Sequence, residues 1–175
     1  MIHIPDAALV LLIGASGSGK STFAARHFDA QTVISSDQLR GTFTGNEGDQ
    51  QATDAAFDRL HQWLDARLAA GALAVVDATN VEWMRRAELI RHARGHGRPA
   101  VAIVFDLALD LCLARNAARP RTVPPAVIRR QHDELRRGLE RLDLEGFNGV
   151  RVLRSDGEID GVVVQIEKGP AARAL

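Results

Sequence analysis

Nine consecutive residues near the N-terminus, Gly14–Thr22, read GASGSGKST and have the spacing G-x-x-x-x-G-K-[ST] of a phosphate-binding loop. Glycines at this spacing let the backbone wrap closely around phosphate groups, with its N–H groups pointing inward. Lys20 is expected to reach the β- and γ-phosphates of a nucleotide, and the Ser21 hydroxyl to ligate Mg²⁺. The residues predicted to bind the nucleotide are Gly14, Ser16, Gly17, Ser18, Gly19, Lys20, Ser21 and Thr22.

The flanks of this loop favour the phosphate site over its alternative, a glycine-rich turn with nothing bound. The apolar run ALVLLI (8–13) precedes it and the helix-forming run STFAARHF follows it. A helix that begins near Gly19 adds its positive N-terminal end to the site. We expect Lys20→Ala to leave the fold intact, on the view that its ammonium contacts only the nucleotide phosphates.

Two opposite charges follow the second apolar run, in the stretch TVISSDQLRG (32–41). Ligands bind beyond the carboxyl ends of the strands in an open parallel sheet, so Asp37 should lie near the γ-phosphate. An aspartate there can accept a proton from an attacking hydroxyl. Arg40 shares its face if the turn is helical. The alternatives are a helix cap for Asp37 and a surface ion pair for Arg40.

A third acid ends the next apolar run, in VVDATN. Asp77 stands where an acid commonly lies near Mg²⁺ or its water shell. Asn80 is also expected to lie near that water shell. Thr79 and Asn80 also suit the cap of the next helix, and the two interpretations are compatible.

Two arginines in DLCLARNAARPRTVPP, Arg115 and Arg119, have the i,i+4 spacing of one helix face. Beside a turn that begins at Pro120, they suit a lid that closes over the γ-phosphate and neutralises developing charge. The alternative is a pair of solvated arginines.

The remaining reactive side chains predict no second site. The histidines form no cluster, and the i,i+4 pair His92 and His96 flanks a glycine, so no metal site is expected there. Trp63 and Trp83 are interpreted as packing residues rather than base-stacking platforms. Cys112, the only cysteine, has apolar neighbours and is expected to be an inert core residue.

The order of the apolar segments predicts the elements that position these residues. Strands are expected at 8–13, 32–36, 73–78, 100–107 and 149–155, and more weakly at 160–167. Helices are expected at 20–28, 81–94, 108–118 and 125–142, and within 49–71, where Gly71 is a natural stop. Continuous apolar strands alternating with helices indicate an α/β fold with a parallel sheet covered on both faces.

Composition is consistent with a single domain, predicted to span 1–169 with a frayed tail at 170–175. One cysteine excludes an internal disulfide, and no apolar run is long enough to cross a bilayer, so a cytoplasmic protein without membrane partners is expected. Residues 85–141 hold 13 arginines and six acids. Arginine binds phosphate bidentately, although solvated helix faces explain such a composition as well.

In this order, GASGSGKSTFA, VISSDQLRG, DQQATDAAFDRLH, VVDATNV, VAIVFDL, ARNAAR and VIRRQHDEL closely resemble the kinase domain of bacterial polynucleotide kinase-phosphatase, an end-healing enzyme of RNA repair. The resemblance covers residues 8–155. It implies a P-loop kinase with strand order 2-3-1-4-5 and a helical lid at about 112–140. It further implies transfer of the γ-phosphate of ATP, with Mg²⁺, to the 5′-hydroxyl end of RNA or DNA.

The resemblance also implies residue roles. Asp37 becomes the general base, Arg40 a contact of the acceptor terminus, and Arg115 and Arg119 the lid arginines. In that family, phosphatase and ligase-like domains usually follow on the same chain, whereas this chain has neither, so it is either a stand-alone kinase or an excised domain. Two alternatives stay open: a kinase for a sugar acid or nucleoside, and a nucleotide-dependent switch without phosphoryl transfer.

Overall fold

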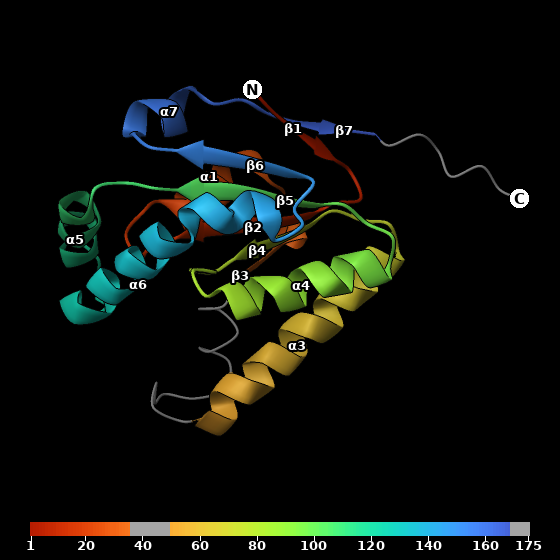
Figure 1. The fold of residues 1–175 in the computed structure, drawn as a ribbon, viewed down its shortest axis with the longest axis horizontal. Coiled ribbons are helices and arrows are strands. Elements are labelled where there is room, and N and C mark those ends of the chain that lie inside the picture. The colour runs from red at the N-terminus through yellow and green to blue at the C-terminus, as the bar shows by residue number, and fades with distance from the viewer. Residues whose placement is uncertain (36–49, 169–175) are drawn as a thin grey trace, which may run out of the picture.

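The computed structural model describes residues 1–35 and 50–168, and only the backbone of residues 50–56. Its centre is a five-stranded, all-parallel sheet with the strand order β3-β4-β2-β5-β6 (Figure 1). Counted along this sheet alone, the order is 2-3-1-4-5, as the resemblance implies. The strands are β2 (Leu9–Gly14), β3 (Val33–Ser35), β4 (Ala74–Asp77), β5 (Ala100–Phe105) and β6 (Gly149–Leu153).

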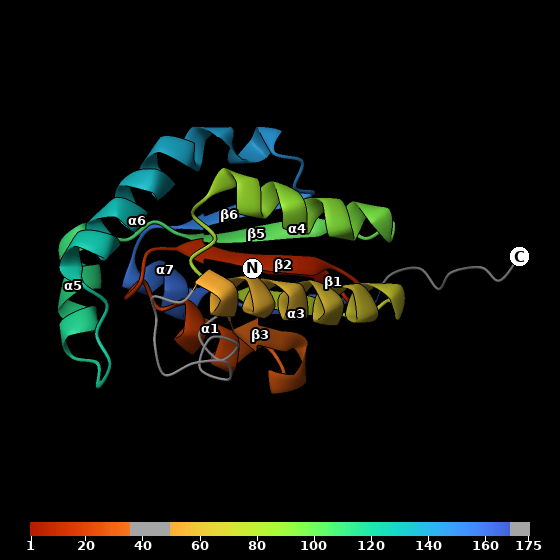
Figure 2. The same ribbon diagram turned by 90° about the horizontal axis from the view of Figure 1, so that it is seen from below.

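Two layers of helices cover the sheet, so the predicted α/β class is confirmed. In Figure 1, α3 (Gln50–Ala69) and α4 (Trp83–Gly95) lie below the sheet, and α7 (Asp156–Gly161) lies above it. Figure 2 shows α3 crossing the front of the sheet next to α4. The other helices are α1 (Lys20–His27), α5 (Leu109–Ala117) and α6 (Pro125–Gly138), with 3-10 turns η1 (Ala30–Thr32) and η2 (Leu139–Leu144).

The central strand β2 explains why both layers are needed. Its residues alternate between two apolar cores, because successive side chains of a strand point to opposite faces. Leu9, Leu11 and Ile13 pack with α3 and α4, whereas Val10 and Leu12 pack with α1 and α7. A strand buried on both faces reads as an unbroken apolar run, as ALVLLI does.

The ends of the structure depart from the sequence prediction. A second, two-stranded parallel sheet joins β1 (Ile2–Pro5) to β7 (Val164–Glu167), and no strand was predicted at residues 2–5. The weak strand at 160–167 is confirmed only from Val164, because α7 extends to Gly161. The helix predicted to reach residue 142 ends at Gly138 and continues as η2.

Several finer predictions can be compared directly. Gly71 follows α3 with φ +66°, as a helix stop requires. Trp63 is partly buried, but Trp83 is 60% exposed at the start of α4, so the packing interpretation of Trp83 is wrong.

No helix among residues 1–35 and 50–168 is both long and apolar enough to cross a membrane. Asp37, Arg40 and the predicted tail at 170–175 lie outside the described residues.

Candidate active site

The loop between β2 and α1 has the conformation that its glycines predict. Gly17 and Gly19 have φ angles of +86° and +94°, which side-chain-bearing residues rarely adopt. A Cβ atom on Gly17 would lie 2.2 Å from the Cys112 carbonyl oxygen of α5, and one on Gly14 would lie 2.7 Å from Ser18 Oγ. The loop therefore packs against α5 more tightly than any side chain at position 17 allows.

Lys20 lies inside this loop and is 7% exposed. Its ammonium donates hydrogen bonds of 2.9 Å to the carbonyl oxygens of Gly14 and Ala15 and one of 3.3 Å to Ser18 Oγ. The expectation that the ammonium contacts only nucleotide phosphates is wrong, because in this structure it also holds the loop closed. Replacing Lys20 with alanine would thus loosen the loop as well as remove a charge.

The turn after β4 supports the start of the loop. The N–H of Gly14 donates to the Thr79 carbonyl at 2.9 Å, and Asn80 Nδ2 donates to the Leu12 and Val76 carbonyls at 2.8 and 3.3 Å. Asn80 has φ +49°, a left-handed conformation that asparagine tolerates better than most residues. The side chain of Asn80 thus fastens β2 to β4, instead of capping the next helix, for which Glu82 is the N-cap.

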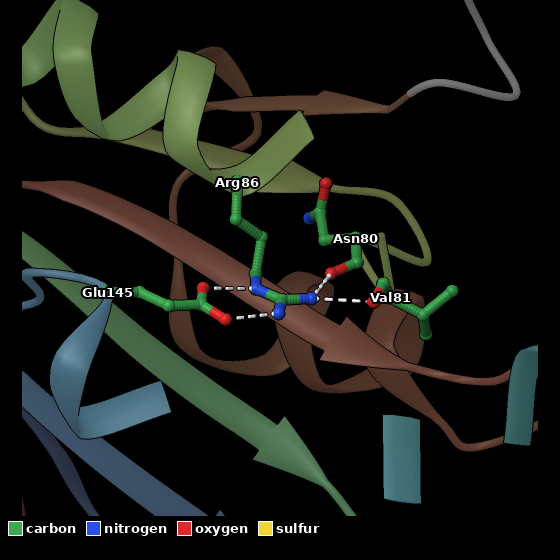
Figure 3. Close-up of polar contacts among 4 residues, drawn as sticks. All are labelled: Asn80, Val81, Arg86 and Glu145. Carbon is green, nitrogen blue, oxygen red and sulfur yellow. Dashed lines mark hydrogen bonds and ion pairs between the residues drawn. The ribbon is translucent and has the colours of Figure 1, made fainter. Parts of the chain in front are cut away.

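A buried arginine binds the backbone carbonyls of this turn (Figure 3). Arg86 is 1% exposed, and its Nη1 donates to the Asn80 and Val81 carbonyls at 2.8 and 2.7 Å. Its other face binds the Glu145 carboxylate bidentately, through Nε and Nη2. Hydrogen bonds therefore run without a break from Glu145 through Arg86 to the turn that supports Gly14.

Asp77 lies where the sequence predicted, at the carboxyl end of β4 beside the phosphate loop. In the sheet register, it pairs with Leu12 of β2 and with Ser35 of β3. Its side chain is 7% exposed, and a buried carboxylate is costly unless cations or donors surround it. The register also shows that β3 ends next to Asp77, two residues before Asp37.

Arg115 and Arg119 line one cleft together with residues of the phosphate loop and of α1 and α7. Arg115 Nη2 forms a 2.7 Å ion pair with Asp156, and its Nη1 is 3.8 Å from where a Cβ of Gly19 would lie. Arg119 lies just beyond the end of α5, so the two arginines share the cleft but not one helix. The cleft is also lined by Gly17, Thr22, Phe23, Arg26, Ile159 and Asp160.

Gln131 is a contact of the loop that sequence reasoning missed. Its Oε1 accepts a 2.9 Å hydrogen bond from the backbone N–H of Ser16, across 115 positions of sequence. The side chain comes from α6, which lies within the segment predicted to form the lid. The only sequence signal was the family-like string VIRRQHDEL, in which nothing distinguished Gln131 from its polar neighbours.

A second cleft lies between α3 and α4, beside the turn after β4. The Arg85 guanidinium stacks over the Phe57 ring, 3.9 Å from its centroid. The cleft is also lined by Leu60, His61, Ala78, Thr79, Asn80, Val81, Glu82, Glu88 and Leu89. Because Thr79 and Asn80 line this cleft and also hold the phosphate loop, the two clefts approach the same edge of the sheet.

The sequence of this chain matches one protein family over most of its length. Residues 9–142, most of the chain, match the family described as an AAA domain. The chain belongs to this family. The match extends from β2 through α6, so it contains the phosphate loop, Asp77, Arg115 and Arg119. No curated protein matches the sequence of this AAA domain significantly.

Solved structures show that the AAA domain has a P-loop kinase fold. A chain of the Pnkp1/Rnl/Hen1 RNA repair complex matches with 23% identity and a TM-score of 0.69, over 82% of this chain and 48% of its own. The present chain thus spans about half the length of that neighbour. A sugar kinase from Janibacter sp. HTCC2649 matches with 20% identity and a TM-score of 0.58 over 84% of each chain. A gluconokinase from Sinorhizobium meliloti 1021 matches with 18% identity and a TM-score of 0.55, over 89% of this chain and 87% of its own.

Outside this site, the expectation that the histidines form no cluster is wrong, whereas Cys112 lies in the core as expected. His61, His92 and His96 gather between α3 and α4, although they form no cluster along the sequence. Cys112 is buried among apolar residues, and burial raises the pKa of its thiol, as expected for an inert core cysteine.

Proposed function

We propose that this AAA domain is an ATP-dependent kinase that phosphorylates the 5′-hydroxyl end of RNA or DNA. The observation that carries the proposal is the convergence of Arg115 and Arg119 with the glycines of the phosphate loop on one cleft. Guanidinium groups aimed at a transferring phosphoryl group stabilise the charge that develops in the transition state.

The nucleotide phosphates fit the loop that Gly17 and Gly19 shape, since both glycines hold backbone that only glycine readily adopts. On binding, the Lys20 ammonium exchanges its carbonyl partners for phosphate oxygens. The Ser21 hydroxyl, exposed in the first turn of α1, and the Asp77 carboxylate are the groups suited to Mg²⁺ and its water shell. Bound Mg²⁺ supplies charge neutralisation at the β- and γ-phosphates.

In the proposed reaction, Asp37 accepts the proton of the acceptor hydroxyl as that oxygen attacks the γ-phosphorus. A new P–O bond forms and the bond to the β-phosphate oxygen breaks, which releases ADP. Arg115 and Arg119 steady the transferring group, and Arg40 holds a phosphate next to the reacting terminus. No covalent intermediate on the enzyme is needed.

The second cleft supports a nucleic-acid acceptor. The Arg85 guanidinium, which lies over the Phe57 ring, lines this cleft and suits a phosphate of the acceptor. The order of the sequence motifs, which resembles polynucleotide kinase-phosphatase, supports the same acceptor. The similarity to a chain of an RNA repair complex is consistent with it. The motif resemblance raises phosphatase and ligase domains of a longer parent chain as partners.

A small-metabolite kinase is the second candidate. It is favoured by the sugar kinase and the gluconokinase, which share the fold over most of their own length. The two candidates differ in how salt affects acceptor binding. A polynucleotide releases counterions when it binds, so its affinity should fall steeply with salt, whereas a metabolite with at most one charge, such as gluconate or a nucleoside, should show little dependence.

The test is transfer of label from γ-labelled ATP to 5′-hydroxyl RNA, 5′-hydroxyl DNA, gluconate and nucleosides. The proposal expects labelled polynucleotide, strong inhibition by salt, and loss of transfer in Asp37→Asn with ATP affinity retained. Arg85→Ala should raise KM for the polynucleotide, whereas Arg151→Ala, exposed on the far edge strand β6, should not. Labelled gluconate or nucleoside without labelled polynucleotide would establish the second candidate, and ATP hydrolysis that no acceptor stimulates would indicate a switch.

A further inference from the structure

Two facing helices bring together a set of side chains that the proposed kinase reaction does not use. On α3, His61 and Asp65 are four residues apart, and on α4, Glu88 and His92 are also four residues apart. Each pair therefore lies on one face of its helix, and the two faces meet. One nitrogen from each of His61 and His92 and one Glu88 oxygen all lie within 4.8 Å of one another.

We propose that His61, Glu88 and His92 bind a divalent transition-metal ion, with Zn²⁺ as the best fit. Two imidazole nitrogens and one carboxylate oxygen are a ligand set that Zn²⁺ accepts, and a water completes the tetrahedron. His61 Nε2 and Glu88 Oε1 are 3.8 Å apart. This is too long for a hydrogen bond but near the separation of about 3.4 Å between two ligands at about 2.1 Å from one zinc ion.

Asp65 supplies the support that metal-binding histidines usually have. Its Oδ1 lies 2.8 Å from His92 Nδ1 and 3.1 Å from His96 Nε2. An ionised carboxylate only accepts, so both nitrogens carry protons, and the lone pair of His92 Nε2 remains for a metal.

The ring of His61 is held in place beside the other ligands. Its ring stacks on that of His92, with centroids 4.7 Å apart and planes 24° apart. A bound ion would cross-link α3 to α4 and thus brace the cleft that His61 and Glu88 help to line.

The experiment is calorimetric titration of the untagged full chain with ZnCl₂, alongside metal analysis after desalting. One ion should bind per chain, and His61→Gln and His92→Gln should each weaken binding at least ten-fold. Asp65→Asn should weaken it about 10- to 100-fold, because it orients a ligand without being one. His3→Gln, an exposed histidine on β1, is the matched control and should bind as wild type.

Two results would overturn the proposal. One is the absence of stoichiometric Zn²⁺ binding by the wild type, which requires no variant to fold. The other is Zn²⁺ binding of unchanged affinity in His92→Gln with normal circular dichroism. Co²⁺ provides a second measurement, since a tetrahedral site with nitrogen ligands gives intense visible absorption that His61→Gln should remove. The outcome does not depend on kinase activity.

Discussion

Replacing Arg86 with methionine should destabilise the protein severely. The arginine is almost fully buried, and its Glu145 partner has a side chain only 12% exposed. Removing one member of a buried ion pair costs about 3–5 kcal/mol, because the other charge is left without compensation. The Asn80 and Val81 carbonyls also lose their donors. Such a loss is a large share of a typical free energy of unfolding of about 5–15 kcal/mol.

Urea unfolding followed by circular dichroism measures this change. Arg137→Met is the matched control, because Arg137 pairs with Glu134 at 2.9 Å on the exposed face of α6, where such pairs contribute about 0–1 kcal/mol. Arg86→Met/Glu145→Met should be more stable than Arg86→Met alone, since no charge is left buried. A cost below about 1 kcal/mol for Arg86→Met, or simple additivity in the double variant, would refute the reasoning.

Three further predictions concern the phosphate loop. Gly17→Ala should abolish ATP binding and lower Tm, because its Cβ would lie 2.2 Å from the Cys112 carbonyl oxygen, whereas Gly95→Ala, with open space around it, should do neither. Arg115→Ala and Arg119→Ala should each lower kcat by about 10²-fold with smaller effects on ATP affinity, and steady-state kinetics with unchanged kcat in both would contradict this. Gln131→Ala should tighten ATP binding about five-fold, as measured by calorimetry. In the wild type, a phosphate must displace the Gln131 amide from the Ser16 N–H, and the lost hydrogen bond costs about 1 kcal/mol. Weaker ATP binding by the variant would argue that Gln131 contacts the nucleotide.

The fold was predictable where local sequence and environment agree. The run 8–13 is apolar because β2 is buried on both faces, and the glycines of the loop are required by positive φ angles. The short strand β1 was not predictable, since IHIP acquires its partner only from β7, at the other end of the chain. Strand pairing across such a distance leaves no periodic signal in four residues.

The supporting residues of the site were not predictable for a similar reason. Arg86 is one of 13 arginines between residues 85 and 141, and only tertiary contacts with Glu145 and the Asn80 turn distinguish it from its solvated neighbours. The spacing of residues along one helix reveals only the pair His92 and His96, whereas the histidine cluster forms between two helices. The i,i+4 pairs on α3 and α4 were visible in the sequence, but their facing each other was not.

The β1–β7 pair has a consequence for how the chain folds. Ile2 pairs with Val164, 162 positions away, whereas the β2–β4 contact between Leu9 and Ala74 spans 65. Closing the longer loop costs about 0.8 kcal/mol more entropy, for a sheet of only two short strands. During synthesis, β2, β4 and β5 leave the ribosome well before β7, so the three central strands of the sheet can assemble while β1 still lacks a partner. The N-terminal strand is therefore expected to dock last, and its amides should exchange with solvent before those of β2.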